Sequence, residues 1–292
     1  MYPVRITRSL ATLLTALPLA GCSGVLAPVG PVGSAELTIL LNALAIMLVI
    51  VVPTLLATLA VAWWFRASNT RARYLPTWSY SGRIELIVWS IPALVVFFLG
   101  GIAWIGSHQL DPARPLPGKA QPLEIDVVAL DWKWLFIYPE QGVASINQMV
   151  APVGVPLQLK ITSASVLNVF FVPRLGSEIY AMNGMTSQLN LQADIPGVYP
   201  GLAAHFSGDG FSDMAFTMHA LSPAEFVDWS GSARAHGLAL DDSAYRALLR
   251  QTQNVKPYTY SSVQPGLFEA ILTQKLPEGD GPDSQQPDTA EN

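Results

Sequence analysis

The sequence predicts two transmembrane α-helices followed by an all-β sandwich with a helical C-terminal extension. Of the 292 residues, 51% are hydrophobic and only 13% are charged, which is about half the usual charged share of a soluble protein. The apolar residues gather in two long runs near the N-terminus, and short alternating stretches follow them. The net charge of -5, without a basic cluster, argues against a nucleic-acid partner.

Residues 1–21 have the layout of an export signal peptide. Two arginines precede the apolar stretch Leu10–Leu19, which ends in Leu-Ala-Gly-Cys at Cys22. This ending resembles the lipobox of bacterial lipoproteins, in which the cysteine is lipidated after cleavage. The alternatives are an ordinary signal peptide or a third membrane helix with an incidental cysteine. We expect Cys22, the sole cysteine of the chain, to carry the lipid (a palmitate) and residues 22–36 to be exported.

Residues 37–106 are expected to form a two-helix transmembrane hairpin. Leu37–Phe65 and Ile84–Ile105 are both apolar runs, and about 20 such residues suffice to span a bilayer. The loop between the runs contains four arginines and no acidic residue. Positive loops stay on the cytoplasmic side, so both outer ends of the hairpin should face the exterior.

Residues 107–221 are expected to form the exported β-sandwich. In 155–162, Val155, Leu157, Leu159 and Ile161 share one face of a strand with period 2. Several such short stretches, separated by Gly and Pro, indicate a sandwich. The other stretches with this pattern are 123–130, 166–173, 187–193 and 213–220.

Residues 222–276 are predicted to form a helical extension. Ser222 and Glu225 form a capping box with a proline at the first helical position. Asp242 is expected to cap a second helix, and Pro265 to open a third. Residues 277–292 contain no large apolar side chain, so we expect a disordered tail.

This layout resembles subunit II of the haem-copper respiratory oxidases. The stretch GRIELIVWSIPALVVFFLGGIAW (82–104) resembles the second helix of that subunit, and DWKWLFIYPEQG (131–142) resembles its aromatic segment. The resemblance extends from residue 21 to about residue 275. It implies that the sandwich is cupredoxin-like.

Cytochrome c oxidases of this family hold a dinuclear copper centre with the patterns His-x-x-x-x-Pro and Cys-x-Glu-x-Cys-Gly-x-x-His-x-x-Met. Both bridging cysteines and both histidines of this centre are replaced here. Soft thiolates are what would hold such a copper pair, so we expect no metal on this chain. The residues at the six positions are Asn168, Ala203, His205, Ser207, Phe211 and Met214.

A copper-free loop of this kind resembles the cytochrome bo-type ubiquinol oxidases, as do the stretches 170–185, 205–216 and 260–272. The resemblance implies a subunit without catalytic residues or a redox centre of its own, in a proton-pumping complex that oxidises ubiquinol and reduces oxygen to water. Haems and copper are expected in the partner subunit I. This chain would cap subunit I, and other subunits of the complex are further expected partners. The complex would lie in the bacterial inner membrane, with the large C-terminal domain in the periplasm.

Glu85 is the candidate functional residue inside the membrane segment. Membrane carboxylates are costly and usually functional, although Glu85 could also reach the headgroups or pair with Arg83. The resemblance places it at the mouth of a proton-uptake channel. Two other functions remain open for the whole chain: a cytochrome c oxidase subunit II, which the missing cysteine pair opposes, and a non-respiratory membrane lipoprotein.

Overall fold

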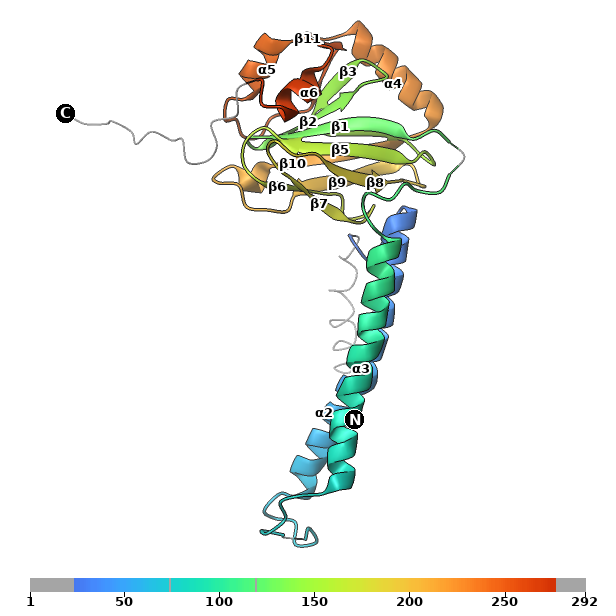
Figure 1. The fold of residues 1–292 in the computed structure, drawn as a ribbon, viewed down its shortest axis with the longest axis vertical. Coiled ribbons are helices and arrows are strands. Elements are labelled where there is room, and N and C mark those ends of the chain that lie inside the picture. Colours follow the sequence, from blue (N-terminus) through green and yellow to red (C-terminus); the bar gives the residue numbers. More distant parts are fainter. Residues whose placement is uncertain (1–23, 74, 119, 277–292) are drawn as a thin grey trace, which may run out of the picture. The chain divides into compact units, whose positions relative to one another are not determined.

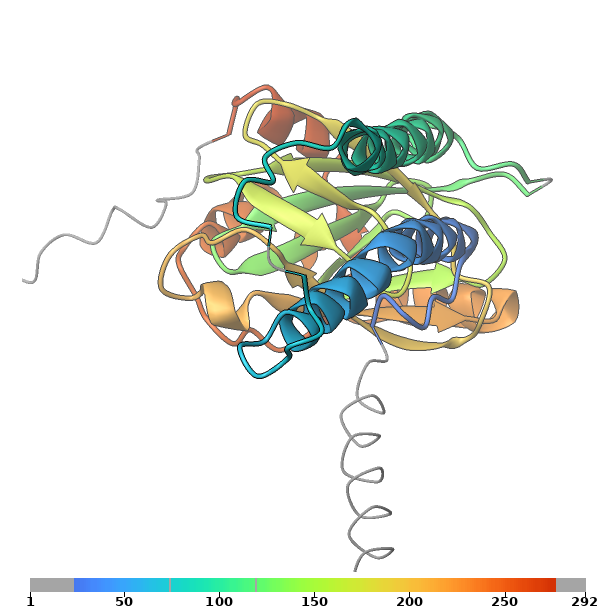
Figure 2. The same ribbon diagram turned by 90° about the horizontal axis from the view of Figure 1, so that it is seen from below.

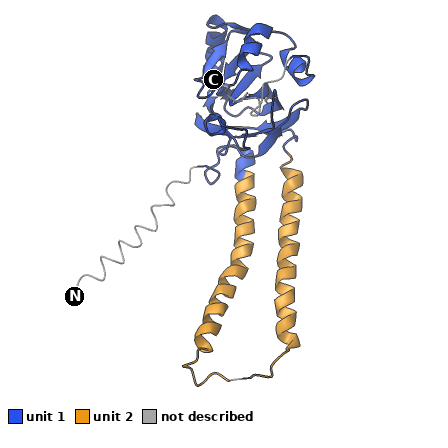
Figure 3. Ribbon diagram, turned by 90° about the vertical axis from the view of Figure 1, so that its left-hand side faces the viewer, with its two compact units in different colours: residues 1–34, 112–292 blue, residues 35–111 orange. Residues whose placement is uncertain are grey.

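The computed structural model describes residues 24–73, 75–118 and 120–276. Cys22, the predicted signal peptide and the predicted tail at 277–292 lie outside these residues. The chain divides into two compact units, residues 35–111 and residues 1–34 with 112–292 (Figure 3). We call the first the helical hairpin and the second the β-domain.

The helical hairpin consists of α2 (Pro31–Trp64) and α3 (Gly82–Gln109). Their most apolar stretches have mean hydropathies of 2.7 and 2.4, and none of those residues is buried. Both helices are long and apolar enough to cross a membrane, which confirms the two predicted spans. Helix α2 begins before the predicted Leu37, because Pro31 is well suited to a first helical position.

The β-domain is a sandwich of two sheets (Figure 1). The first sheet has the strand order β12-β3-β2-β1-β5-β8, and the second sheet has the order β4-β10-β9-β6-β7. The pairs β1–β5 and β4–β10 are parallel, and the other pairs in these sheets are antiparallel. Their bounds are β1 Leu123–Leu130, β2 Lys133–Tyr138, β3 Val143–Ile146, β4 Gln148–Pro152, β5 Leu157–Ser163, β6 Asn168–Phe171, β7 Glu178–Ala181, β8 Ser187–Leu191, β9 Gly197–Ala203, β10 Ala215–Leu221 and β12 Tyr258–Tyr260.

Four aromatic rings form the centre of the core between the two sheets. Trp134 and Phe136 come from β2, Phe170 from β6 and Phe216 from β10, and all four are buried. The rings of Phe170 and Phe216 stack with centroids 5.1 Å apart, and Trp134 meets both edge-on at 5.5 and 5.7 Å. Such aromatic pairs add to the free energy that apolar burial supplies. This cluster holds the two sheets together.

The residues that lead into α2, together with the first turn of that helix, also belong to the β-domain. Val29 donates its backbone N–H to Arg174 O (2.8 Å), and its own carbonyl accepts from Asp194 N (2.8 Å). Gly33 donates to Leu175 O (2.9 Å), while Val29 and Val32 join the core. Residues 29–33 are therefore tied to the sandwich by backbone hydrogen bonds.

Residues 222–276 form what we call the C-terminal cover. It contains α4 (Pro223–Ala235), α5 (Asp242–Leu248), α6 (Leu267–Leu272), strand β12 of the first sheet, and the short pair β11 (Ala239–Leu240) with β13 (Ser262–Val263). The capping box at Ser222 is confirmed, since Ser222 Oγ accepts from Glu225 N and Glu225 Oε2 accepts from Ser222 N. The second helix is capped by Asp241 rather than by the predicted Asp242.

From β11 onward, the C-terminal cover packs on the outer face of the first sheet (Figures 1 and 2), whereas Phe226 and Ala233 of α4 join the core between the sheets. A second hydrophobic cluster joins Leu130 and Leu135 of the sheet to Tyr245 and Phe268 of the cover. Strand β1 is consequently buried on both faces over most of its length. This double burial explains why its sequence ends in the unbroken apolar run VVAL.

Candidate functional site

The loop after β9 occupies the region where the sequence places the former copper positions. Strand pairing aligns Ala203 at the end of β9 with Phe170 in β6. Ala203 N donates to Met214 O (3.0 Å), and Ala204 N donates to Val169 O (3.0 Å). These bonds close the loop and place both of its ends beside the start of β6, where Asn168 lies. We call residues 203–214 the degenerate loop.

Trp132 anchors the degenerate loop from the turn between β1 and β2. Its Nε1 donates to Ser207 O at 2.9 Å, and the indole is only 4% exposed. A Cβ at Gly210 would overlap the Trp132 ring, so the backbone approaches the ring as closely as a glycine permits. Trp132 itself has φ +61°, a left-handed conformation that is unusual for a bulky residue. The sequence indicated an aromatic segment here, but not this contact.

The six former ligand positions do not fit a dinuclear copper centre. Asn168 is buried with its Oδ1 unpaired within the described part of the chain, and its Nδ2 donates to Val166 O (3.2 Å). Ala203 offers a buried methyl group, and Ser207 Oγ lies 3.9 Å from Met214 Sδ. A hydroxyl, an amide and a methyl group cannot replace two bridging thiolates.

The remaining two positions do not supply the missing donors. His205 is partly exposed, its Nδ1 lies 3.0 Å from Phe206 O, and its ring meets Tyr180 at 6.5 Å. Phe211 packs its ring against the core and against Phe206. Among the described residues, no group of three or more His, Cys, Asp or Glu side chains could hold a metal ion. The degenerate loop is thus held by packing and hydrogen bonds.

Lys133 is a buried cation that sequence reasoning missed. Its Nζ donates to Arg250 O (2.8 Å), Thr252 Oγ1 (2.8 Å) and Asp131 O (3.2 Å). Burial lowers the pKa of Lys133 to about 8, and the Asp131 charge opposes this shift. The sequence feature that could have revealed it is a lysine at the start of the otherwise apolar strand KWLFIY. Lys133 fastens the C-terminal cover to the sheet.

Asn147 makes a second polar connection between the sheet and the cover. Its Oδ1 accepts from Trp134 N (2.8 Å), and its Nδ2 donates to Val255 O (2.8 Å). Both ends of this amide are therefore satisfied in a buried position, as a stable buried polar group requires. Asn147 therefore joins the backbone of Trp134 in the first sheet to the backbone of Val255 in the cover.

Asp126 lines a cavity of about 390 Å³ between the first sheet and α6. The carboxyl is 7% exposed, and its Oδ1 has no partner among the described residues. Burial raises the pKa of Asp126 to about 7; the Glu124 charge adds to this shift and Lys160 opposes it. Lys160 Nζ instead donates to Glu124 Oε1 at 2.5 Å. Asp126 is therefore a carboxyl that titrates near neutral pH.

Glu85 lies in the first turn of α3 and is exposed. Its backbone N–H donates to Ser81 O at 3.0 Å. In the described part of the chain, its carboxylate makes no ion pair with Arg83. The proton-entry role that the sequence assigns to Glu85 therefore stays a prediction.

Known proteins resemble this chain over both units. The family described as "Cytochrome C oxidase subunit II, periplasmic domain" matches residues 123–221, and "COX Aromatic Rich Motif" matches 234–275. Cytochrome bo(3) ubiquinol oxidase subunit 2 of Pseudomonas aeruginosa is 46% identical over 92% of this chain and 82% of its own. Ubiquinol oxidase subunit 2 of Acetobacter aceti is 47% identical over 92% of this chain and 88% of its own.

The chain belongs to the ubiquinol oxidase subunit II family. This confirms the predicted family and the fold of two helices followed by a cupredoxin-like sandwich. Family membership also makes the chain part of an oxidoreductase complex, and it leaves the non-respiratory lipoprotein without support. The aromatic-rich motif of this subunit II is the segment that Lys133 and Asn147 bind through Arg250, Thr252 and Val255.

Proposed function

We propose that this subunit II is a copper-free structural cap of a proton-pumping ubiquinol oxidase and carries no electrons itself. The observation that supports this most directly is the degenerate loop, in which Trp132 holds the backbone and no thiolate is available. A copper relay is needed when the donor is a water-soluble cytochrome. Quinol dissolves in the bilayer, and it can deliver electrons directly to a haem-bearing subunit I.

The surface around the degenerate loop supports a docking role. Phe206 is 71% exposed, Tyr180 is 54% exposed and Leu202 is 36% exposed. Neighbouring apolar side chains of this kind mark protein–protein contact sites. We infer that subunit I, which would hold the haems and the copper, covers this surface. The loop at the copper-site positions of the family would then serve as a contact surface.

The donor preference of the purified complex tests this proposal. It should oxidise ubiquinol rapidly and leave reduced cytochrome c unchanged, because no metal in the β-domain can accept its electron. The full-length subunit on its own should contain far less than one copper per chain. Rapid oxidation of reduced cytochrome c, or stoichiometric copper with a thiolate absorption band, would contradict the proposal.

A matched variant shows whether the loop has kept the geometry of a metal site. It carries Asn168→His, Ala203→Cys, Ser207→Cys and Phe211→His, which restores the missing imidazoles and thiolates at their original spacing. If this variant binds copper and the wild type does not, the wild-type protein lacks copper because these four side chains are missing. If neither protein binds copper, the backbone of the loop, which Trp132 holds at Ser207 and Gly210, also differs from that of a copper site.

For Glu85 we propose a role in proton uptake at the cytoplasmic end of α3. Its exposed position in the first helical turn lets it collect protons from water. Glu85→Gln removes the titratable proton and keeps the size, so assembly should be normal while turnover falls partially. Arg83→Gln is the control, since it should leave turnover intact. Wild-type turnover in Glu85→Gln would remove this role.

We propose that Cys22 is the lipidated first residue of the mature chain and that the β-domain is periplasmic. The Leu-Ala-Gly-Cys ending of the signal supports the first point, and the arginine-rich loop between the helices supports the second. Mass spectrometry of the mature protein should find acyl chains on Cys22. Cys22→Ser should abolish them without releasing the protein from the membrane, because two spanning helices anchor it more firmly than acyl chains.

A further inference from the structure

The cavity of about 390 Å³ between the first sheet and α6 has more carboxyl groups than cations in its wall. Glu124 and Asp126 come from β1, Glu269 comes from α6, and the one cationic residue of the lining is Lys160 of β5. Much of the remaining wall is apolar and includes Ile137, Pro265 and Phe268. The wall therefore combines an excess of acidic groups with apolar side chains.

Lys160 is engaged by Glu124 rather than by Asp126. The pairing of β1 with β5 places Lys160 opposite Asp126, but its Nζ donates to Glu124 Oε1 at 2.5 Å. Asp126 and Glu269 make no ion pair in the described part of the chain. Two carboxyl groups of the cavity are thus left without a cationic partner.

Asp126 is directed from β1 toward the C-terminal cover. Alternate residues of a strand share one face, and Val128 and Leu130, which share the face of Asp126, pack against the cover. Asp126 is 7% exposed, and its Oδ1 accepts no hydrogen bond from any described residue. Buried polar groups normally have a partner, so a donor bound in the cavity would satisfy this carboxyl.

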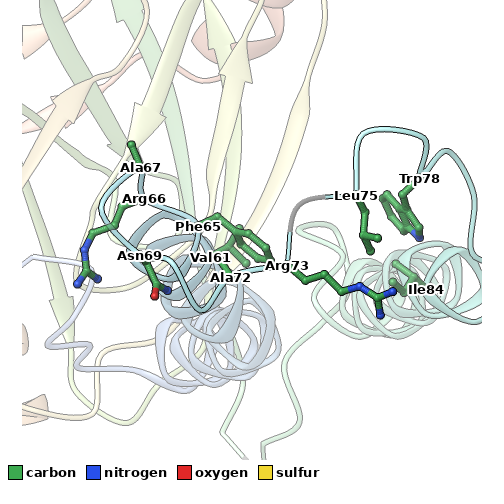
Figure 4. A pocket seen from close by; sticks show the side chains of 10 residues that line it. All are labelled: Val61, Phe65, Arg66, Ala67, Asn69, Ala72, Arg73, Leu75, Trp78 and Ile84. Carbon is green, nitrogen blue, oxygen red and sulfur yellow. The ribbon is translucent and has the colours of Figure 1, made fainter.

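The cavity at the turn between α2 and α3 has no comparable centre, although its volume is larger, about 740 Å³. Figure 4 shows the side chains of Arg66 and Arg73 extending away from each other, with that of Phe65 between them. The two guanidinium groups therefore do not meet at one ligand. The cavity under α6 differs, because a buried carboxyl without a partner forms part of its wall.

The lining of the cavity under α6 selects an organic cation over other ligands. An anion would be repelled by the carboxylates, and a neutral molecule would leave their charges uncompensated. Among the described residues, no group of three or more His, Cys, Asp or Glu side chains could hold a metal ion. An alkyl chain would suit the apolar wall at Ile137 and Phe268, and the volume is within the usual range for a small-molecule site.

We propose that this cavity binds a small aliphatic amine as its ammonium ion. The ammonium group would donate to Asp126, and the alkyl chain would lie against Ile137 and Phe268. A diamine would bring its second ammonium group to Glu269, which is exposed. Because Asp126 belongs to β1 and Glu269 to α6, a bound diamine would join the C-terminal cover to the first sheet.

Isothermal titration calorimetry of the full-length protein tests the site. The protein is purified in mild detergent with the subunits that accompany it and is titrated with the diamine putrescine at about pH 8. We expect one saturable site per chain, no binding of butanediol, and slower hydrogen exchange in α6 once putrescine is bound. Absence of saturable binding, or displacement of putrescine by Mg²⁺ at equal concentration, would overturn the proposal.

Substitutions of the two unpaired carboxyl groups locate the ligand. Asp126→Asn keeps the shape of the side chain and should weaken putrescine binding by about tenfold or more. Glu269→Gln should weaken putrescine clearly more than butylamine, which has one ammonium group, and it decides the question if Asp126→Asn fails to assemble. Glu178→Gln, exposed on β7 and outside the cavity, is the matched control. Equal loss of putrescine binding in Glu178→Gln and Glu269→Gln would overturn the proposal.

The pH dependence of binding gives a second measurement. Burial raises the pKa of Asp126 to about 7; the charges of Glu124 and Glu269 add to this shift, and Lys160 opposes it. An aliphatic amine stays protonated up to about pH 10, so the ionised fraction of Asp126 limits binding. The affinity should rise about 30-fold between about pH 5.5 and about pH 8.5, and Asp126→Asn should abolish this rise. An equal rise in Asp126→Asn and wild type would contradict the contact with Asp126.

Discussion

The space between the two sheets and the space between the first sheet and the C-terminal cover are both buried, but they are built differently. Between the sheets, Trp134, Phe170 and Phe216 pack ring against ring. Under the cover, apolar side chains share the space with Lys133, Asn147 and Asp126, all of them buried. Apolar burial is non-directional, whereas buried polar groups must find specific partners.

This difference indicates a division of roles. The aromatic core supplies the free energy that holds the sandwich together, and the polar groups determine where the cover sits on it. Lys133 and Asn147 reach backbone carbonyls of residues 250 and 255, so a shifted cover would leave these groups unsatisfied. The cover should also be the more sensitive of the two interfaces to pH, because Asp126 and Lys133 titrate there.

The largest effect is expected from Phe216→Ala. Removing a buried ring from the inter-sheet core should reduce the free energy of unfolding by about 3–5 kcal/mol. Hydrogen exchange in the intact protein should accelerate in both sheets. Phe206→Ala is the control, since Phe206 is 71% exposed beside the same core and should change stability little. Acceleration confined to the C-terminal cover would contradict the assigned role of the core.

The second prediction concerns Asp126 and pH. The folded protein keeps Asp126 protonated up to about pH 7, whereas the unfolded chain loses this proton near the ordinary aspartate pKa of 3.8. The folded state binds the extra proton between these values, so stability falls as pH rises from about 4 to 7 and then levels. The Asp126 contribution between pH 5 and 8 is roughly 2–3 kcal/mol.

Asp126→Asn should remove this contribution, so the variant should lose less stability than the wild type between pH 5 and 8. Glu124→Gln is the control: Glu124 is partly exposed and paired with Lys160, and this variant should keep most of the slope. Thermal unfolding followed across this range measures both. A parallel pH dependence in Asp126→Asn and wild type would show that another group causes the slope.

Lys133→Met should weaken the cover selectively. The apolar stem is preserved, but the carbonyls of Asp131 and Arg250 lose a donor, which costs about 2 kcal/mol. Exchange should accelerate at residues 250–276 and stay unchanged in the second sheet. Lys160→Met serves as control, because its ion pair is about one-third exposed and should contribute under about 1 kcal/mol. If the cover is equally protected from hydrogen exchange in Lys133→Met and Lys160→Met, Lys133 does not fasten the cover.

The smallest effect is expected at the start of the cover. Ser222→Ala removes the N-cap of α4 and should cost about 1 kcal/mol. Exchange of the first amides of α4 measures this loss. Ser232→Ala, at an exposed position within the same helix, should leave these amides unchanged. An identical response of the two variants would show that the capping box does not stabilise the helix.

Patterns that depend on spacing along the chain were predictable. The two apolar runs predicted α2 and α3, the period-2 stretches predicted β1, β5 and β10, and the Ser222–Glu225 spacing predicted the start of α4. The absence of a cysteine pair at Ala203 and Ser207 was also a property of the sequence itself. Helix α5 shows where prediction from spacing ends. Asp241 and Asp242 are both suitable N-cap residues, and only the backbone geometry makes Asp241 the one that accepts from Ala244 N.

The sequence by itself determined the membrane hairpin, the sandwich, the family and the lack of copper-binding donors, because each depends on residue type and local spacing. The tertiary structure decided that residues 29–33 are tied to the sandwich, that Lys133 fastens the cover and that Trp132 anchors the degenerate loop. In all three, one partner is a backbone carbonyl from a distant part of the chain. Every residue carries such a carbonyl, so the sequence does not show which carbonyl will accept a hydrogen bond. Only the fold decides which donor lies beside it.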